Sequence, residues 1–568
     1  MRKSVLIVCA LKIAILGECT NLGSKPHIVF MVADDLGWND FAIHGSNQIP
    51  TPNIDALAYN GAILHNFYTQ QSCTPSRAAL LTGNYPIRTG LQGIPLDSGE
   101  NRSLPIDMPT MGERFQELGY KTHMVGKWHL GAACKEVTPT KRGFDTHFGY
   151  WNGYVGYFDY KISTPINDTH NFTGFDLHNE FKPEWGLIGQ YATELFTKKS
   201  LEVIDKHDTD KPLFLMINHL AGHAGHDGVE LGVPNVTEAN KKYGYIKTPE
   251  RRLLADIVNH LDRSVGEVIT KMSEKKMLDN SIIIFFSDNG AQTTGKYQNF
   301  ASGWPFRGLK FTLLEGGVRG TGIIYSPLLE KRRYVNRHLI HITDWLPTLY
   351  HIAGGDTKAL GKIDGKNQWN TISRNDTTKR TDILLNIDEV NGYSGMLGYG
   401  GQYKLLNGSY NDGIYNGYYG DHGREPENPD YNIQGILNSP TNIAIQTIEQ
   451  QPLTPAQIKK LRAEVDMKKY KPQGTYPTFT CDEYCLFDLH ADPCETTNLI
   501  GDEEKQDIVK NLKKKLLAYN QQLVPQTNKP VDVNSNPALF NNTWFPWLKC
   551  KLHNNIWLGS VHDIKIYS

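Results

Sequence analysis

Short apolar runs that end in polar side chains are the feature of this sequence that most constrains its fold. The run SIIIFFSDNG ends in Asp288 and Asn289, and the run HIVFMVADD ends in Asp34 and Asp35. Continuous apolar runs of this length are typical of strands that are buried on both faces of a sheet. The sequence therefore predicts central strands whose last residues carry carboxylate and amide groups.

Two further runs follow the same pattern. YKTHMVGKWHLG is a strand that ends near Lys127 and His129, and KPLFLMINHLAGH is a strand that leads to His223. Helical patterns separate the strands, which indicates an α/β domain with a largely parallel sheet. Ligands of such sheets bind beyond the carboxyl ends of the strands. At one strand end, polar residues could simply belong to a loop, but four converging ends favour a site.

The chain changes character after about residue 390, where Gly, Tyr and Asn become frequent and turn signals recur. We predict an α/β domain over residues 25–390 and a smaller α+β domain over residues 391–568, built on an antiparallel sheet. Near the end of the chain a charged amphipathic helix is expected. Its apolar side is predicted to consist of Ile508, Leu512, Leu516 and Leu517.

The overall charge excludes some classes of function. The 568 residues contain 59 Lys and Arg against 60 Asp and Glu, which leaves a formal net charge of −1. This balance is not that of a nucleic-acid-binding protein or of a polybasic membrane protein. The chain is therefore expected to be an ordered globular protein that binds no nucleic acid.

The N-terminus predicts entry into the secretory pathway. Residues 1–18 combine a basic start with an apolar run and are interpreted as a signal peptide, although a buried first strand or helix is the alternative. No other apolar run is long enough to span a bilayer, so an integral membrane protein is not expected. Seven N-x-S/T sites support a secreted or lysosomal glycoprotein. They are Asn101, Asn167, Asn171, Asn235, Asn375, Asn407 and Asn541.

The cysteine pattern favours a local disulfide in the C-terminal part. Cys481, Cys485 and Cys494 form a cluster, and Cys485 with Cys494 is the preferred pair, across the turn in CLFDLHADPC. Other connectivities remain open, because spacing alone does not determine them. Cys73 has no partner nearby in the sequence.

The strand-end residues predict a metal site. Asp34, Asp35, Asp288 and Asn289 offer three carboxylates and an amide oxygen. This all-oxygen set suits a hard divalent cation such as Ca²⁺ or Mg²⁺, whereas zinc sites use thiolates and several imidazoles. The alternative is that these residues only cap turns or helices.

Cys73 opens the stretch CTPSRAALLTGNYP, which predicts a helix start with Thr74 and Pro75 as capping and first-turn residues. The free N–H groups of a helix start attract anions and favour the thiolate. We interpret Cys73 as an activated nucleophile that faces an anionic substrate; a plain buried cysteine is the alternative. Five further side chains fit the same anion: Arg77, Lys127, His129, His223 and Lys310.

Several of these motifs together resemble the type I sulfatases. CTPSR is similar to the family's C-x-P-x-R core, and GKWHLG is similar to its second signature. IVFMVADDLGWND, SDNG and WPFRGLKFTLLEGGVRG match in the family's order, and RTGLQ and RGFDTHFGYWNGY resemble the arylsulfatase B subgroup. The resemblance covers nearly the whole chain from Lys25. It implies an alkaline-phosphatase-like fold, with a mixed, mostly parallel sheet flanked by helices.

The resemblance also implies a chemistry for Cys73. In this family the cysteine is oxidised to formylglycine in the endoplasmic reticulum by a formylglycine-generating enzyme. One hydroxyl of the hydrated aldehyde attacks sulfur and displaces the alcohol. The second hydroxyl then loses a proton, and sulfate is eliminated to regenerate the aldehyde. As in phosphoryl transfer, positioning and charge neutralisation dominate.

The resemblance further implies a role for each matching residue. Modified Cys73 would join Asp34, Asp35, Asp288 and Asn289 as ligands of one calcium ion. Arg77 would orient the diol, and Lys127 and Lys310 would bind sulfate oxygens. His129 would take the proton of the second hydroxyl. His223, together with Lys310, would assist the leaving oxygen.

The loop after the strand KPLFLMIN departs from the family pattern. It reads AGHAGHDGVELG, so His219, His223 and His226 are all candidates, and spacing favours His223. The subgroup resemblance implies the 4-sulfate of N-acetylgalactosamine in dermatan or chondroitin sulfate as substrate. Glucosinolates or other small sulfated metabolites are the second option.

Two other functions are alternatives to that of a sulfatase. A phosphatase or phosphodiesterase of the same superfamily would use Ser or Thr and commonly two zinc ions, which Cys73 and the all-oxygen set argue against. A catalytically silent binding protein on the same fold is the other alternative. Loss of Cys73, Lys127 or a metal ligand would indicate such a protein, and all are present.

Overall fold

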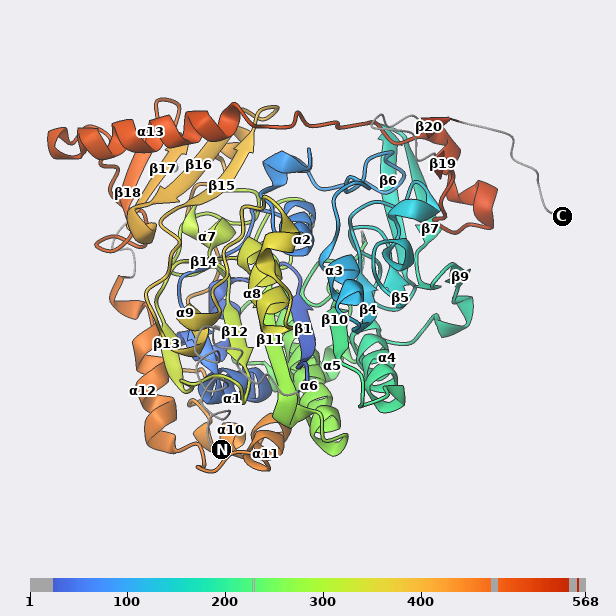
Figure 1. The fold of residues 1–568 in the computed structure, drawn as a ribbon, viewed down its shortest axis with the longest axis horizontal. Helices are drawn as coiled ribbons and strands as arrows, with labels where there is room; N and C mark the ends of the chain where they lie inside the picture. Colours follow the sequence, from blue (N-terminus) through green and yellow to red (C-terminus); the bar gives the residue numbers. More distant parts are fainter. Residues whose placement is uncertain (1–23, 227, 229, 471–478, 551–558, 561–568) are drawn as a thin grey trace, which may run out of the picture.

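The computed structural model describes residues 24–226, 228, 230–470, 479–550 and 559–560, so the predicted signal peptide at residues 1–18 lies outside the described residues. Its centre is a ten-stranded sheet (Figure 1). From edge to edge the strands are β13 (Tyr334–Asn336), β2 (Ala62–Leu64), β12 (Gly322–Tyr325), β11 (Ser281–Ser287), β1 (His27–Ala33), β10 (Leu213–Asn218), β4 (Lys121–Lys127), β5 (Thr146–Tyr150), β8 (His178–Asn179) and β9 (Lys182–Pro183).

The middle of this sheet is parallel. β11, β1, β10, β4 and β5 run in the same direction, while β12 pairs with β11 in the antiparallel sense. All seven residues of β1 and of β11 are buried, as expected for strands covered on both faces. The predicted mostly parallel α/β sheet is confirmed.

Alternating side chains of β1 face two separate helical layers. Val29 and Met31 pack into a core formed with α1 (Pro52–Asn60), α4 (Ala192–Lys206) and α6 (Pro249–Glu274). Ile28 and Phe30 pack into the opposite core. That core is formed with α2 (Cys73–Thr82), α3 (Met111–Glu117), α8 (Trp345–Ile352) and α9 (Trp369–Ser373).

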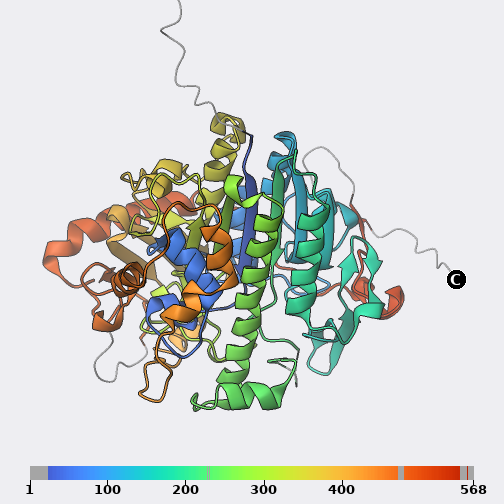
Figure 2. The same cartoon turned by 90° about the horizontal axis from the view of Figure 1, so that it is seen from below.

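Segments from late in the chain complete the first of these layers. The helices α10 (Ile433–Leu437), α11 (Pro440–Gln446) and α12 (Pro455–Val465) lie around α1, and α11 also contacts α6 (Figure 2). Ile445, Ile458 and Leu461 are buried in the same core as Val29. The division of the chain at residue 390 stays a prediction, and helices from beyond it contribute to the core of the large sheet.

A smaller, antiparallel sheet lies beside the large one (Figure 1). Its strands are β15 (Ile383–Asp388), β16 (Tyr393–Gly398), β17 (Tyr403–Asn407) and β18 (Cys485–Asp488), and α13 (Gln506–Asn520) lies across it. Leu512 and Leu516 of α13 are buried, but the prediction for Leu517 is wrong because its exposed fraction is 57%. One residue turns a helix by about 100°, so Leu517 points away from the sheet that Leu516 contacts.

Shorter elements complete the description. They are β3 (Phe67–Tyr68) paired with β14 (Ile340–His341), the hairpin of β6 (Lys161–Asn167) and β7 (His170–Phe175), β19 (Lys549–Cys550) paired with β20 (Gly559–Ser560), α5 (Val236–Lys242) and α7 (Glu315–Val318). None of the helices in the described part of the chain has both the length and the apolar character that a bilayer crossing requires.

The disulfides differ from the predicted pair. Cys481 is bonded to Cys485, and Cys134 is bonded to Cys550. Cys494 is a buried free thiol whose Sγ donates to a backbone carbonyl. The prediction of Cys485 with Cys494 is therefore wrong. Cys485 opens β18, so the chain leaves it in an extended strand, whereas the turn before the strand brings Cys481 back to it.

Candidate active site

The carboxyl ends of the central strands bring the predicted polar residues together. Asp34 and Asp35 follow β1, Asp288 and Asn289 follow the neighbouring β11, and Lys127 closes β4. Their exposed fractions are 1% or less. Because these strands are parallel, their ends lie at the same edge of the sheet, and the polar side chains form one buried cluster.

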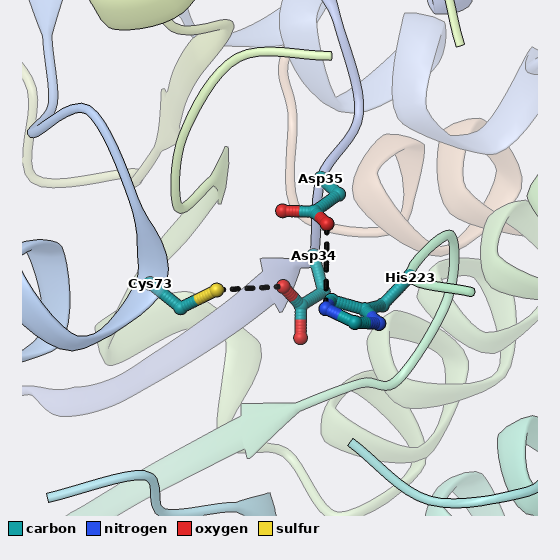
Figure 3. Close-up of side chains that lie close together, drawn as sticks. All are labelled: Asp34, Asp35, Cys73 and His223. Atoms are coloured by element: carbon teal, nitrogen blue, oxygen red, sulfur yellow. Dashed lines mark hydrogen bonds and ion pairs between the residues drawn. The ribbon is translucent and has the colours of Figure 1, made fainter. Parts of the chain in front are cut away.

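Cys73 joins this cluster from the first position of α2. Its Sγ donates to Asp34 Oδ1 at 3.8 Å, as Figure 3 shows. The predicted cap is wrong: Ser72 is the N-cap, and Thr74 lies within the helix. The Thr74 hydroxyl instead donates to the carbonyl of His129 and accepts from a backbone N–H, which ties the helix start to the loop after β4.

Two cations pair with the carboxylates on the Cys73 side. Lys127 Nζ donates to Asp34 Oδ2 at 2.6 Å. Arg77 Nη2 donates to Asp288 Oδ2 at 2.8 Å and lies 3.7 Å from Asp34 Oδ2. Both cations are buried, so neither is stabilised by bulk water and each depends on its carboxylate partner.

Asp35 is the centre of a second group of contacts. Lys310 Nζ donates to Asp35 Oδ2 at 2.7 Å, and Asn289 Nδ2 donates to Asp35 Oδ1 at 2.7 Å. His223 Nε2 lies 3.4 Å from Asp35 Oδ2 (Figure 3). The three side chains come from three different loops, so only the fold brings them to one carboxylate.

The two adjacent carboxyls differ in pKa. Burial, reinforced by Asp288, raises the pKa of Asp34 to about 8. Burial also acts on Asp35, but the charges of Lys310 and His223 outweigh it and hold its pKa at about 2. A cation bound at Asp34 would favour its ionised form.

The donor set fits a hard divalent cation. Asn289 Oδ1 is buried and has no hydrogen-bond partner among the described residues. Ligand atoms of Asp34, Asp35, Cys73 and His223 all lie within 4.8 Å of one another. Carboxylate and amide oxygens are the ligands that Ca²⁺ and Mg²⁺ prefer, so the chemistry of the site suits such an ion.

The two histidines of the site are held by backbone carbonyls. His129 Nε2 contacts the carbonyl of Leu96 at 2.9 Å, which leaves Nδ1 buried without a partner among the described residues. Burial, aided by Lys127, holds the pKa of His129 well below its ordinary value. A neutral ring that donates from Nε2 has a free lone pair on Nδ1, so His129 can accept a proton there.

The structure separates the three histidine candidates after β10. His223 Nδ1 contacts the carbonyl of Ala224 at 2.6 Å and directs Nε2 toward the cluster. His219 instead contacts Ser264, and His226 contacts Asp159. Of the three, His223 is therefore the one that reaches the carboxylates.

Sequence reasoning did not single out two side chains that shape this site. Asn218, the last residue of β10, donates to the carbonyl of Lys127 at 2.9 Å. The ring of Tyr154 stacks on His223 with centroids 5.4 Å apart. The position of Asn218 at the end of an apolar run was a usable signal. Tyr154 comes from a distant loop and could not be assigned to the site from spacing.

Gly126 allows β4 and β10 to approach closely beside the site. Its φ is +97°, and a Cβ at this position would lie 1.9 Å from the carbonyl oxygen of Asn218. Any other residue would force the two strands apart. The glycine therefore helps to set the position of Lys127.

Taken together, these contacts define a class of protein. Three carboxylates, three cations and a thiol lie buried at the carboxyl edge of a parallel sheet. The imidazoles of His129 and His223 lie buried beside them. Such a site suits a metal-assisted enzyme that acts on a tetrahedral oxyanion ester.

Comparison with known proteins identifies the family. The model of the Sulfatase family matches residues 26–355. The chain is 35% identical to arylsulfatase J of Mus musculus over 541 residues, which cover 93% of this chain and 81% of the mouse protein. It is 29% identical to N-acetylgalactosamine-6-sulfatase of Homo sapiens over 357 residues, which cover 61% of this chain and 66% of the human protein.

A solved structure shares the fold. The crystal structure of Ps i-CgsB, in complex with k-i-k-neocarrahexaose, aligns with a TM-score of 0.66 and 23% identity and covers 89% of this chain and 95% of its own. The chain belongs to the sulfatase family. It is therefore a sulfatase, a hydrolase of sulfate esters, as its sequence motifs predict.

Proposed function

We propose that this sulfatase cleaves sulfate esters with a formylglycine derived from Cys73 and with one bound calcium ion. The observation that carries the proposal is the position of Cys73 at the start of α2, 3.8 Å from Asp34 and inside the buried charged cluster. A thiol in that position would be fully shielded from solvent, since its exposed fraction is 1%.

The metal ligands would be Asp34, Asp35, Asp288, Asn289 and residue 73. A calcium ion would supply positive charge that polarises the sulfate ester and favours the deprotonated nucleophile. Without it, burial and the neighbouring Asp288 raise the pKa of Asp34 to about 8, and a bound cation would favour the ionised form of this ligand.

Lys127 and Lys310 would bind sulfate oxygens, and Arg77 would orient the group at position 73. All three cations are buried, so their interaction with an oxyanion would be screened less than at the surface. Their carboxylate partners hold them in place before substrate arrives, which reduces the reorganisation that charge development would otherwise require.

His129 and His223 would handle the protons. The free Nδ1 of His129 would take the proton whose loss releases sulfate, because its Nε2 is already engaged with a carbonyl. His223 Nε2, with Lys310, would serve the oxygen of the leaving alcohol. The separation of the two rings into different loops is consistent with two distinct proton transfers.

The proposed substrate is the 4-sulfate of N-acetylgalactosamine in dermatan or chondroitin sulfate. The name of the human relative, N-acetylgalactosamine-6-sulfatase, supports a sulfated amino sugar. The name of the mouse relative, an arylsulfatase, favours the second candidate, which is a small sulfated metabolite such as an aryl sulfate or a glucosinolate.

The proposal includes maturation in the secretory pathway, by a formylglycine-generating enzyme, and a secreted or lysosomal destination. Two disulfides agree with an oxidising compartment. Asn167, Asn171, Asn235 and Asn541 are exposed, so these predicted glycosylation sites are accessible.

Mass spectrometry of the peptide that contains Cys73 tests the proposal directly. In protein secreted from a eukaryotic host, we expect this peptide to be about 18 Da lighter than its thiol form, as conversion to the aldehyde requires. The same preparation should hydrolyse a chromogenic aryl sulfate, and chelation of divalent cations followed by readdition of Ca²⁺ should remove and restore that activity.

The Cys73→Ala variant is the control for the nucleophile. We expect it to fold normally and to lose turnover. Full activity of this variant would refute the assignment. A converted wild-type protein that hydrolyses no sulfate ester would instead favour the silent binding protein.

A further inference from the structure

Aromatic side chains lie beside His223, which would serve the leaving oxygen in the proposed function. The ring of Tyr154 is nearly parallel to that of His223, at an interplanar angle of 10°. The ring of Tyr297 lies 6.0 Å from His223 and 4.9 Å from Tyr154. The imidazole thus connects the buried carboxylate cluster to a pair of tyrosines.

A second aromatic group follows Lys310, the other side chain assigned to the leaving oxygen. The Nζ atom of Lys310 lies 5.5 Å from the ring of the adjacent Phe311. Phe311 stacks on Tyr410 at 5.1 Å, and Tyr410 stacks on Tyr415 at 6.2 Å, with interplanar angles of 18° and 17°. These three rings form a near-parallel row.

The two aromatic groups meet at one loop. Gly295 lies in the same loop as Tyr297, and a Cβ on it would come within 2.5 Å of the Tyr415 hydroxyl. The ammonium group of Lys296 lies 4.8 Å from the centroid of Tyr297. Lys296 also acts on the pKa of Tyr410, which burial raises and the lysine charge lowers. The loop therefore joins the tyrosine pair to the row.

We call these five side chains the aromatic rim: Tyr154, Tyr297, Phe311, Tyr410 and Tyr415. All except Tyr154 are half-buried, whereas the carboxylate cluster behind them is fully buried. Core packing would be the ordinary explanation for so many rings. It does not account for Phe311 and Tyr415, which belong to no hydrophobic cluster of the described residues.

We propose that the aromatic rim binds the ring of the leaving alcohol and so selects the substrate. An aromatic face stacks on a flat ring, and both an aryl group and the C–H face of a pyranose offer such a surface. Ligand sites commonly combine aromatic walls with a few polar groups, here those of the sulfate site. The inference rests on the proposed function and adds to it the group that the enzyme recognises.

Tyr297 offers the sharpest test because it is half-buried on a loop. In the Tyr297→Leu variant we expect kcat/KM to fall about 3- to 10-fold, as the loss of one ring contact implies. 4-Nitrophenyl sulfate and 4-sulfated N-acetylgalactosamine should be compared, and a fall with either one supports the proposal and identifies the kind of ring. The inhibition constant of inorganic sulfate, which has no leaving group, should stay within about twofold.

Two variants serve as controls. Tyr297→Phe keeps the ring and should lose less kcat/KM than Tyr297→Leu. Tyr399→Leu removes an exposed tyrosine in the turn between β16 and β17 and should change nothing. Unchanged kcat/KM of Tyr297→Leu with both substrates would overturn the inference while leaving the proposed function intact. An equal change in the inhibition constant of sulfate would also overturn it. Absence of any wild-type hydrolysis would refute both.

Discussion

Two residues of the site hold backbone conformations that most side chains avoid. Asp35 has φ of 60° and His129 has φ of 58°, both in the left-handed region. Such a conformation costs about 1 kcal/mol or more for a residue that is not glycine, and it concentrates at functional sites. At both positions it turns the chain sharply after a strand end, so that a side chain enters the cluster.

Lys310 gives the residue-scale prediction. Replacing it in Lys310→Met removes the cation that lies 2.7 Å from Asp35 and would face a sulfate oxygen. We expect kcat/KM for an aryl sulfate to fall by about 100-fold or more, as for the loss of a preorganised oxyanion donor. Lys182→Met, which removes an exposed lysine, is the matched control. A Lys310→Met enzyme with half of the wild-type activity would refute the role.

At the scale of elements, a side chain of one helix caps another. Asp262 of α6 accepts hydrogen bonds from the backbone N–H groups of Asn53 and Ile54 in the first turn of α1, each at 2.9 Å. The local N-cap, Thr51, makes no such bond. Asp262 therefore satisfies N–H groups that would otherwise be buried without partners, and it fixes α1 to α6.

The titration of Asp262 should be visible in the stability of the fold. Burial raises its pKa to about 7, although the hydrogen bonds to α1 act in the opposite direction. The folded protein then holds the proton of Asp262 to higher pH than the unfolded chain does. The contribution of this proton to the free energy of unfolding is present at low pH and is lost as the pH rises through about 7. Between pH 5 and 8 the change is about 3 kcal/mol.

The Asp262→Asn variant lacks this titration. We expect the Tm of the wild type, relative to that of Asp262→Asn, to be higher at pH 5 than at pH 8. Asp210→Asn, which alters an exposed carboxyl, should follow the wild type at both pH values. A difference between wild type and Asp262→Asn that does not vary with pH would refute the assignment.

At the scale of the whole molecule, the last part of the chain returns to the large sheet. The disulfide between Cys134 and Cys550 spans a sequence separation of 416 residues. The loop that it anchors follows β4 and contains His129. Backbone hydrogen bonds from Trp547 and Leu548 to Ala133 reinforce the same junction. The C-terminal segment thus supports the loop on which a proposed catalytic residue lies.

The two disulfides should differ in their effect on stability. A cross-link that closes a long loop restricts the unfolded chain more than one that closes a short loop. Removing the long-range bond, in Cys134→Ser/Cys550→Ser, should lower the free energy of unfolding by about 2–4 kcal/mol. Cys481→Ser/Cys485→Ser opens a separation of only four residues and should cost less. Thermal unfolding under oxidising conditions compares them, and the reverse order would contradict the argument.

Much of the fold and of the candidate site was predictable because the evidence is local. The apolar run before Asp288, for example, predicts the strand and also shows that polar side chains follow its carboxyl end. The cap of α2 was assigned to Thr74, whereas Ser72 occupies the N-cap position without a side-chain cap hydrogen bond. Helix starts are ambiguous by one or two residues. The disulfide pairing was wrong for a different reason, since pairing depends on distances that spacing does not contain.

By itself, the sequence determined the strands, their polar ends and the motifs of a sulfatase. These follow from hydrophobic periodicity and from residues that are neighbours along the chain. Spacing favoured His223, and the tertiary structure shows that this histidine reaches Asp35. Only the tertiary structure decided which cysteines pair and which aromatic rings surround the site. The aromatic surroundings, for example, depend on contacts between Tyr154, His223 and Tyr297, which lie in separate loops. Burial of the apolar faces brings such loops together, and that packing is a property of the whole chain.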